Sequence, residues 1–475
     1  MHRLKSAVAA VLTAALTAVL TTSGSAAPTT AAGCRIAYQV THEWPGGFSA
    51  SVDVTNLGDA VGRWRLEWSF GAGQTITQLW NGSARQSGAQ VVVDSAGHNG
   101  SLGTGASTGI GFVARTSGSA NPVPTGFTLN GTACTGSVPA PGPLAGAHTA
   151  GRVTASGRYS WPGVYFEGRF RGTGVGIVLD DSANDYDVQV DGATVATLVT
   201  PGRTTHWVNG LTDAEHHVRL VKRTESPHAA GEFGGFVAAA GGAVLAKPAA
   251  RTRQIEFIGD SLTAGYGNLS TTRDCSANGG VTRNTNTDVS FAALTARALN
   301  ADYQVNAFSG LGMVRNYNGH SAGTSYRTYY DRALLNVDGD VWQNPGSWRP
   351  RVVVVGLGTN DFSTALNPGE QWPSHESLVA AYRSAYHGFL DRLRSRHGAT
   401  ASIVVSVPEA SGAFADAARQ VVQERNNQGD GRVHHWNYGD PALDRLGCDW
   451  HFSARDHRLI AAKLGDYLSA LPLAW

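Results

Sequence analysis

The sequence predicts a multidomain protein in which two β-rich domains precede an α/β domain with a parallel sheet. Glycine supplies 59 of the 475 residues, about 12% against a usual ~7%. It is spread among Val, Thr, Ser and Trp, as in short strands joined by turns. A prior of roughly 150 residues per domain gives about three domains. After Arg253 apolar strands alternate with helical periods, which is typical of a parallel α/β sheet.

Composition excludes several classes of partner. The chain has 37 Lys and Arg against 36 Asp and Glu, a formal net charge of +1, and only 15% charged residues. Such a balance provides no broad attraction to nucleic acid or to an anionic membrane. Hydrophobic residues make up 42% of the chain, which is enough for packed cores and argues against global disorder.

The N-terminus has the pattern of a secretory signal peptide. His2, Arg3 and Lys5 precede an apolar run at 7–20, and small residues follow at 23–27. The run is too short for a stable membrane anchor. We therefore expect residues 1–27 to be a signal peptide and the protein to be secreted. A lipoprotein signal ending at Cys34 is the alternative, but it lies well beyond the apolar run.

Four cysteines fit an oxidising compartment. They are Cys34, Cys134, Cys275 and Cys448. Three pairings are possible, and the natural one joins Cys34 to Cys134 and Cys275 to Cys448, each within one segment. A metal site is a poor alternative because no CxxC pair occurs.

Short strands divided by turns fill the first segment, residues 34–134, which predicts a β-sandwich. Expected strands are 48–54, 64–70, 75–79, 91–93 and 109–113. A Pro-rich linker is expected at 135–147.

The second β-rich domain is expected at 148–250. Its predicted strands are 175–179, 186–190, 194–199 and 217–221. Asp191-Gly192 between two of them is a strong hairpin signal.

The α/β domain is expected at 251–475. Its apolar strands are 255–258, 352–355 and 403–407. Helices are expected at 292–299, at 378–393 with Ser374 as N-cap, and around 459–468.

Two tryptophans of the first domain lie beside turns. Trp44 precedes Pro-Gly-Gly and Trp80 precedes Asn-Gly, whereas Trp64 and Trp68 lie within a strand and are expected in the core. The segments 44–48, 52–56, 64–70 and 127–134 resemble a family 2 carbohydrate-binding module.

This resemblance implies a row of exposed aromatic rings that binds cellulose or xylan. Flat rings suit the apolar faces of pyranose rings. Trp44 and Trp80 match two platform positions, but His98 stands where the cellulose-binding pattern has a third Trp. We therefore expect weaker or altered polysaccharide binding.

A catalytic serine is suggested at Ser261, in Gly-Asp-Ser-Leu at a strand-to-helix junction. This position exposes the hydroxyl beside free backbone N–H groups; on this segment alone, a helix N-cap is an equal interpretation. Three later segments favour catalysis. The first, residues 306–310, offers the Gly310 N–H, and the second, residues 356–361, places Asn360 at the carboxyl edge of the sheet. The third, residues 447–451, carries Asp449 and His451. The order Ser, Gly, Asn, His resembles the SGNH (GDSL-type) hydrolases.

That resemblance implies roles for each residue. His451 takes the Ser261 proton and returns it to the leaving alcohol, and Asp449 orients His451. The Ser261 and Gly310 N–H groups and the Asn360 amide bind the oxyanion, with Gly312 as the alternative to Gly310. Because Asp449 precedes His451 by two residues rather than the usual three, a backbone carbonyl is a second candidate for orienting the imidazole. Asp456-His457 is a competing pair, more simply interpreted as part of a surface helix.

Residues 148–475 resemble carbohydrate esterase family 2. The resemblance rests on Tyr-Ser-Trp-Pro-Gly at 159–163, Val-Asp-Gly at 190–192, Gly-Thr-Asn-Asp at 358–361 and Cys-Asp-Trp-His at 448–451. It implies a β jelly roll joined to an α/β SGNH-hydrolase domain with a parallel sheet. The implied activity removes O-acetyl groups from xylan or glucomannan. Trp450 is expected to form an aromatic wall for the sugar, with ordinary packing as the alternative.

The leading hypothesis is thus a secreted, monomeric serine esterase acting on acetylated plant polysaccharide without a cofactor. A lipase or arylesterase of the same superfamily is one alternative, and a non-catalytic polysaccharide-binding protein is another. A metal-dependent hydrolase, suggested by Asp449 with His451 and by His434-His435, lacks a recognisable ligand spacing. We expect the pairs at 216–217 and 434–435 to be solvated or strand-end histidines.

Overall fold

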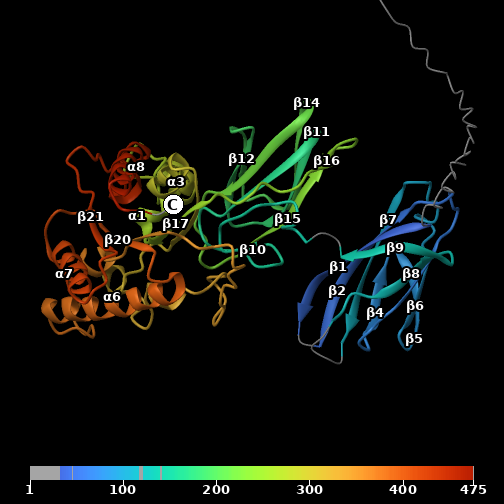
Figure 1. Cartoon of the computed structure of the whole chain (residues 1–475), viewed down its shortest axis with the longest axis horizontal. Helices are drawn as coiled ribbons and strands as arrows, with labels where there is room; N and C mark the ends of the chain where they lie inside the picture. The colour runs from blue at the N-terminus through green and yellow to red at the C-terminus, as the bar shows by residue number, and fades with distance from the viewer. Residues whose placement is uncertain (1–32, 45, 117–120, 140–141, 474–475) are drawn as a thin grey trace, which may run out of the picture. The chain divides into compact units, whose positions relative to one another are not determined.

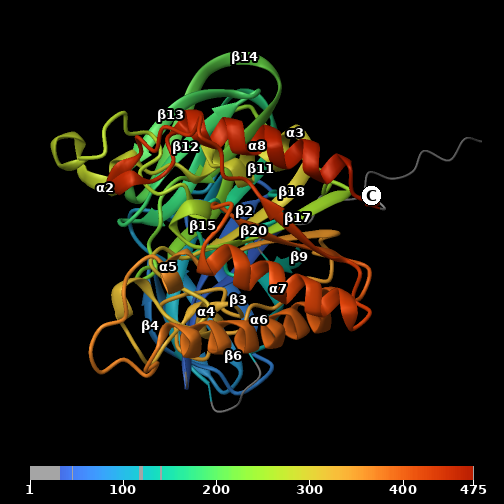
Figure 2. The same ribbon diagram turned by 90° about the vertical axis from the view of Figure 1, so that its left-hand side faces the viewer.

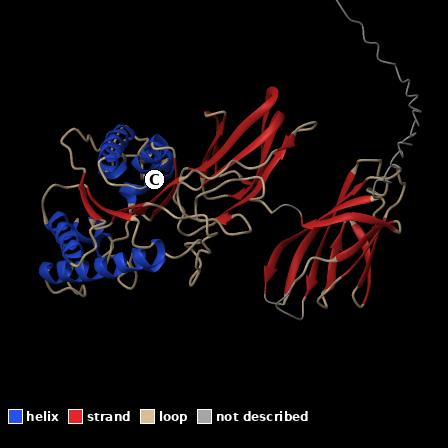
Figure 3. Ribbon diagram, viewed as in Figure 1, coloured by secondary structure: helices blue, strands red, loops and turns tan. Residues whose placement is uncertain are grey.

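The computed structural model describes residues 33–44, 46–116, 121–139 and 142–473, so the predicted signal peptide lies outside it. The chain divides into two compact units, residues 1–140 and 141–475. The first contains strands without helices in its described part, and the second contains a β domain and a helix-covered sheet (Figures 1 and 3). No helix within the described ranges is long and apolar enough to cross a membrane.

The first unit is the predicted β-sandwich. Its strands are β1 (Cys34–Trp44), β2 (Gly47–Asn56), β3 (Arg65–Ser69), β4 (Thr75–Trp80), β5 (Gly82–Ser87), β6 (Gln90–Ser95), β7 (Ser107–Arg115), β8 (Thr125–Leu129) and β9 (Thr132–Pro139). They follow the order β4-β7-β2-β1-β9-β8-β3-β6-β5. Alternate residues of β2 enter the core, where Trp64 and Trp68 are buried as predicted. The Cys34–Cys134 disulfide joins β1 to its parallel neighbour β9.

The predicted linker at 135–147 differs from the structure in its first part. Strand β9 continues to Pro139, and Val138 and Pro139 lie opposite Ala37 and Tyr38 of β1. Proline is compatible with the end of such a strand because only its own N–H is missing from the ladder.

The second unit begins with an antiparallel, barrel-like β domain, in the place of the predicted jelly roll. Its strands are β10 (Arg158–Tyr159), β11 (Tyr165–Asp181), β12 (Asp185–Val190), β13 (Ala193–Val199), β14 (Gly202–Lys222), β15 (Gly231–Ala238) and β16 (Ala243–Val244). Long strands β11 and β14 pair along most of their length. Asp191 and Gly192 both have positive φ, 50° and 83°, and form the predicted hairpin between β12 and β13.

Five parallel strands form the sheet of the α/β domain, in the order β18-β17-β19-β20-β21. The strands are β17 (Arg253–Gly259), β18 (Ala301–Ala307), β19 (Val352–Gly356), β20 (Ser402–Val407) and β21 (Val433–Asn437). The helices are α1 (Ser261–Ala264), α2 (Gly280–Asn284), α3 (Phe291–Ala298), α4 (Tyr326–Tyr329), α5 (Thr359–Phe362), α6 (His375–His397), α7 (Ala413–Asn427) and α8 (Ala454–Ser469). Short 3₁₀ turns occur at Ser276–Asn278, Thr287–Val289, Tyr317–Gly319 and Cys448–Trp450.

Helices cover both faces of this sheet, as Figures 1 and 2 show. Helices α3 and α8 pack with Ile255, Phe257 and Val354 on one face. Helices α6 and α7 pack with Val353 and Val355 on the other. These alternate side chains explain why the strands are apolar throughout. Helix α6 begins at the predicted N-cap Ser374, whose hydroxyl accepts the Ser377 N–H.

Buried ion pairs join the β domain to the α/β domain. Arg219 of β14 donates to both carboxylate oxygens of Asp288, at 3.1 and 2.8 Å, and to the Tyr303 hydroxyl at 2.8 Å. Burial alone would raise the pKa of Asp288, but the Arg219 and Arg297 guanidinium groups hold it well below its ordinary value. The two domains of this unit therefore share one polar interface as well as one apolar core.

Removing the Arg219 guanidinium tests how much the ion pair with Asp288 stabilises the junction between the β domain and the α/β domain. We expect Arg219→Ala to destabilise the second unit by about 3–5 kcal/mol, because the Asp288 charge is left buried and less compensated. Urea unfolding of the full chain measures the change. The matched control is Arg419→Ala, which breaks an exposed pair with Asp416 and should cost no more than about 1 kcal/mol. Equal effects of the two variants would contradict a structural role for Arg219.

Candidate active site

The predicted catalytic residues lie beyond the carboxyl ends of the parallel strands. Ser261 follows β17 as the first residue of α1, and Asn360 follows β19 in α5. After β17 the chain leaves to β18 on one side and returns to β19 on the other. Such a reversal of strand order is where α/β folds bind ligands.

Ser261 and His451 are brought into direct contact. The His451 Nε2 lies 2.8 Å from the Ser261 Oγ. The His451 Nδ1 lies 3.0 Å from the Cys448 carbonyl oxygen and 3.2 Å from that of Asp449. Carbonyls only accept hydrogen bonds, so the neutral imidazole carries its proton on Nδ1 and leaves Nε2 free to accept the serine proton.

The expected orienting role of the Asp449 carboxylate does not agree with this geometry. Its side chain accepts a hydrogen bond from the Tyr266 hydroxyl at 2.9 Å, whereas it is the Asp449 backbone carbonyl that faces the imidazole. The backbone alternative, a carbonyl oxygen as the acceptor for the imidazole, therefore describes the contact. Tyr266 also packs its ring on His451, with 4.3 Å between ring centroids.

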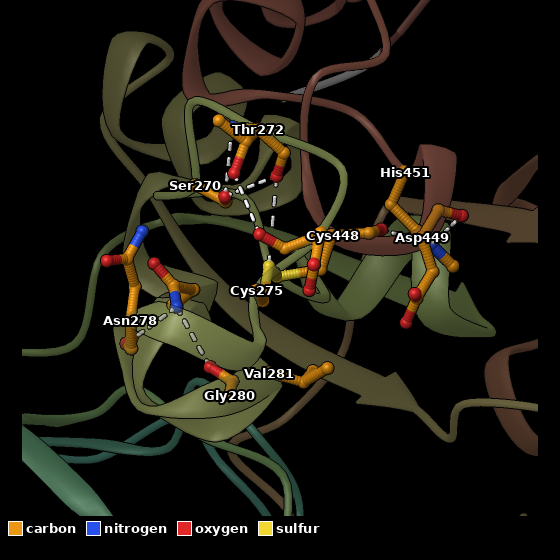
Figure 4. The surroundings of a disulfide bond; sticks show 12 residues. Ser270, Thr272, Cys275, Asn278, Gly280, Val281, Cys448, Asp449 and His451 are labelled. Carbon is orange, nitrogen blue, oxygen red and sulfur yellow. Dashed lines mark hydrogen bonds between the residues drawn. A yellow bond between two sulfur atoms is a disulfide. The ribbon is translucent and has the colours of Figure 1, made fainter.

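The segment carrying His451 has an unusual backbone. Asp449 and Trp450 both have positive φ, 51° and 66°, which non-glycine residues seldom adopt. Contacts with residues 267–275 hold this turn. The Cys275–Cys448 disulfide links the two segments (Figure 4). The Cys448 N–H donates to the Gly267 carbonyl at 3.1 Å, and the Asp449 N–H donates to the Arg273 carbonyl at 2.8 Å. The disulfide pairing expected from the sequence is thus present.

Gly267 is required by the same contact. A Cβ on this residue would lie 2.3 Å from the Cys448 Cβ, and its φ is 59°. Only glycine combines that backbone conformation with so close an approach. The segment after the nucleophile therefore meets the segment before His451 without an intervening side chain.

Two backbone N–H groups are available for an oxyanion. Across the described residues, neither the Ser261 nor the Gly310 N–H donates a hydrogen bond to another group of the protein. The alternative, Gly312, donates its N–H to the Asn316 Oδ1 at 3.2 Å. A Cβ on Gly312 would also lie 2.1 Å from the Arg315 carbonyl oxygen, so close packing accounts for this glycine.

Asn360 is buried, and its amide already has partners. Its Nδ2 donates to the Leu311 carbonyl at 2.9 Å and to the Asp260 Oδ2 at 3.1 Å. The Asn360 amide could therefore donate to an oxyanion only if its longer hydrogen bond, to the Asp260 Oδ2, were broken. Burial raises the pKa of Asp260 to about 7, so this acceptor changes charge near neutrality.

Two residues that shape the oxyanion segment, residues 309–315, were not predicted from the sequence. Asp361 accepts the N–H groups of Met313, Val314 and Arg315 at 2.8, 2.8 and 2.9 Å. Glu225, from the β domain, accepts the N–H of Ser309 at 2.9 Å and also binds its hydroxyl. The Asn-Asp pair at 360–361 was a usable signal for Asp361, whereas nothing local connects Glu225 with residues 84 positions away.

Trp450 is placed beside the dyad with 63% of its surface exposed. The Arg273 guanidinium lies 3.5 Å from the centroid of its ring, close enough for a cation–π contact. One side of the ring is thus supported by the protein. This exposure favours a substrate-facing wall over ordinary packing.

Trp44 and Trp80 of the first unit are also exposed, by 41% and 46%. Trp80 lies opposite Gly111 of β7, and Trp44 lies opposite Gly47 of β2. Because Phe48 and Phe112 alternate inward, both glycines lie on the outer face of the sheet. His98 is exposed in the segment between β6 and β7.

The other histidines singled out in the sequence lie within helices and strands. The interpretation of Asp456 and His457 as surface residues is wrong, since both are buried: His457 Nδ1 accepts the Phe291 N–H at 3.0 Å, and Asp456 accepts the Asp444 and Arg445 N–H groups. The pairs at 216–217 and 434–435 lie within β14 and β21. In the described chain, no group of three His, Cys, Asp or Glu is arranged to hold a metal ion.

Three family models match consecutive parts of the chain. They are described as Cellulose binding domain, at residues 34–134, Carbohydrate esterase 2 N-terminal, at 149–248, and GDSL-like Lipase/Acylhydrolase, at 255–464. The acetylxylan esterase / glucomannan deacetylase of Cellvibrio japonicus (strain Ueda107) is 39% identical over 336 residues, covering 69% of this chain and 92% of that protein.

Solved structures agree with these matches. A carbohydrate esterase whose active site is described as having divergent catalytic and non-catalytic binding functions shares 39% identity and a TM-score of 0.63, covering 69% of this chain and 98% of the other. A family two carbohydrate esterase from Clostridium thermocellum, solved with cellohexaose, shares 32% identity and a TM-score of 0.60, covering 68% and 98%. The chain therefore belongs to the family 2 carbohydrate esterases and carries a cellulose-binding type of module before its esterase domains.

Proposed function

We propose that this esterase removes O-acetyl groups from plant cell-wall polysaccharide, either acetylated xylan or glucomannan, through an acyl-enzyme on Ser261. The observation that carries the proposal is the 2.8 Å contact between the Ser261 Oγ and an imidazole whose other nitrogen faces backbone carbonyls. Relatives with this domain pair include an acetylxylan esterase / glucomannan deacetylase.

The reaction follows from this geometry. His451 Nε2 takes the hydroxyl proton as the Ser261 Oγ attacks the acetyl carbonyl carbon, and the Ser261 and Gly310 N–H groups receive the oxyanion. The bond between the acetyl carbon and the sugar oxygen then breaks, and His451 protonates the leaving sugar oxygen. In the second half His451 takes a proton from water as its oxygen bonds to the acetyl carbon. The bond from the Ser261 Oγ to that carbon then breaks, His451 returns the proton to Oγ, and acetate is released. The carbonyls of Cys448 and Asp449 stabilise the imidazolium that forms in each half.

The other parts of the chain serve delivery and orientation. Trp44 and Trp80 bind the uncharged polymer through ring stacking, with His98 weakening or altering that surface, and Trp450 holds the acetylated sugar beside the dyad. Attachment through the module raises the local concentration of substrate without changing the chemistry. The N-terminal segment 1–27 directs secretion, and the mature protein works extracellularly as a monomer.

Acetate release from acetylated xylan and acetylated glucomannan tests the reaction. We expect Ser261→Ala to lower kcat by at least about 10⁴-fold, since the nucleophile is lost. Ser276→Ala, which removes an exposed hydroxyl of the same domain, should act like the wild type. Equal acetate release by Ser261→Ala would disprove the nucleophile. Faster cleavage of long-chain acyl esters than of acetylated sugar would favour the lipase alternative.

The variant Asp449→Asn distinguishes the contribution of the Asp449 carboxylate from that of its backbone carbonyl. The side chain keeps its shape and tolerates positive φ, so His451 should remain held by the carbonyls. We expect kcat to stay within about tenfold of the wild type, whereas loss of the acid from a true triad costs about 10⁴-fold. Steady-state kinetics on acetylated xylan measure the change, with His451→Ala as the inactive reference. A loss approaching that of a triad acid would restore Asp449 to the catalytic machinery.

The pH dependence tests the state of His451. Burial lowers its pKa below the ordinary 6.5. Because the general base acts as the neutral imidazole, kcat/KM should fall as the pH drops through this lowered pKa, with a midpoint below 6.5. A midpoint near 7 would instead assign the acidic limb of the kcat/KM profile to Asp260, whose pKa is about 7. Asp260→Asn would then abolish that limb.

A further inference from the structure

The β domain of the esterase has an outer face that its catalytic role does not use. It is formed where the first half of β14 and the whole of β15 flank β11. Val175, Ile177 and Leu179 of β11 point into the core. The residues between them therefore point outward, together with their partners across the sheet.

Trp207 is the centre of this face. It lies opposite Gly176 of β11, and Gly176 lies opposite Val237 of β15. Trp207 is 44% exposed. A Cβ on Gly176 would lie 3.1 Å from the Trp207 Cε2 and 2.6 Å from the Val237 Cγ2. The indole thus rests against the sheet over a position where any side chain would lift it.

The same arrangement occurs twice in the sugar-binding module. A Cβ on Gly111 would lie 2.2 Å from the Trp80 Cε2, and one on Gly47 would lie 2.7 Å from the Trp44 Nε1. Both rings are exposed to a degree close to that of Trp207. Each is a tryptophan laid on the outer face of a β-sheet over a cross-strand glycine, and the module carrying two of them matches the cellulose binding domain.

The surroundings of Trp207 fit an uncharged, hydroxyl-rich ligand. Thr205 and Asn209 are exposed on the same side of β14 and supply hydrogen-bonding groups on either side of the ring. Arg203 and Asp180, the next outward pair, form an ion pair at 2.7 Å. Exposed Glu232 of β15 lies opposite Asp180, and Arg158 of β10 lies opposite Glu232. These four residues carry two charges of each sign, so the face has an aromatic plane and polar groups without a net charge.

We propose that this face, centred on Trp207, is a binding site for a neutral pyranose polysaccharide, separate from both the module and the Ser261 site. The site lies on the β domain, whereas Ser261 and His451 lie on the α/β domain. Only the choice of ligand rests on the proposed function, since binding at Trp207 does not require Ser261 chemistry.

Covering a sheet glycine with an aromatic ring also stabilises a sheet, and the choice of substitution separates the two roles. Trp207→Leu keeps apolar cover over Gly176 but has no flat ring. Trp207→Tyr keeps a flat ring of smaller area. A purely structural Trp207 would leave polysaccharide affinity unchanged in both variants.

The experiment uses the full chain with Trp44→Ala and Trp80→Ala, so that the module no longer dominates binding. Affinity electrophoresis in gels containing soluble xylan or hydroxyethylcellulose measures retardation. We expect Trp207→Leu to weaken affinity about tenfold, and Trp207→Tyr to remain within about threefold of the parent. Val199→Ala, an exposed apolar residue of β13, is the matched control and should leave affinity unchanged. Unchanged affinity in the Leu variant overturns the proposal.

Three further measurements support the interpretation of the affinity change. Hydrogen exchange of the parent should show protection of residues 203–209 when xylan is added. This measurement does not require a Trp207 variant that folds. Absence of protection overturns the proposal. Sedimentation of the parent and the Leu variant shows whether the face joins two copies: loss of a dimer with no change in retardation also overturns it. Turnover of 4-nitrophenyl acetate should be the same in all variants, which separates this site from a failure of the proposed catalysis.

Discussion

The hydrogen bond from the His451 Nδ1–H to the Cys448 carbonyl is the contact on which the catalytic geometry depends. It fixes the tautomer of the imidazole and directs Nε2 at the Ser261 Oγ. The acceptor is a backbone carbonyl and not an ionisable side chain. The direction of this hydrogen bond is therefore set by the backbone of the turn. That turn is strained at Asp449 and Trp450 and is held by the Cys275–Cys448 disulfide and by contacts with residues 267–273. The Cys275–Cys448 disulfide thus helps to orient the His451 imidazole.

The rest of the unit brings this turn and the nucleophile together. Ser261 and Asn360 leave neighbouring parallel strands at the reversal of strand order, and the oxyanion segment leaves the strand on the other side of β17. The β domain contributes through Arg219, which reaches Asp288, and through Glu225, which reaches Ser309. It is therefore part of the catalytic scaffold. The low charge of the chain agrees with a substrate that is bound by rings and hydrogen bonds.

Much of this was predictable because the signals are local. The apolar strands, the Ser374 cap and the Asp191-Gly192 turn depend on nearby residues, and the Ser and Asn segments each follow a predicted apolar strand. The sequence left two groups open for orienting His451, the Asp449 carboxylate and a backbone carbonyl, because a sequence does not distinguish a side-chain acceptor from the carbonyl of the same residue; in the structure the carbonyls of Cys448 and Asp449 face the imidazole. Glu225 was missed because its contact joins two domains. Asp456 and His457 were expected at the surface, although they bind backbone N–H groups in the interior.

The most direct test of this account removes the covalent link and follows turnover. The double variant Cys275→Ala/Cys448→Ala should stay folded yet lose about tenfold to a hundredfold in kcat, because a displacement of about 1 Å at the imidazole is enough for such a loss. Its matched control, Cys34→Ala/Cys134→Ala, breaks the disulfide of the binding module and should leave kcat unchanged. A wild-type kcat in the folded Cys275→Ala/Cys448→Ala variant would contradict the claim that this link orients His451.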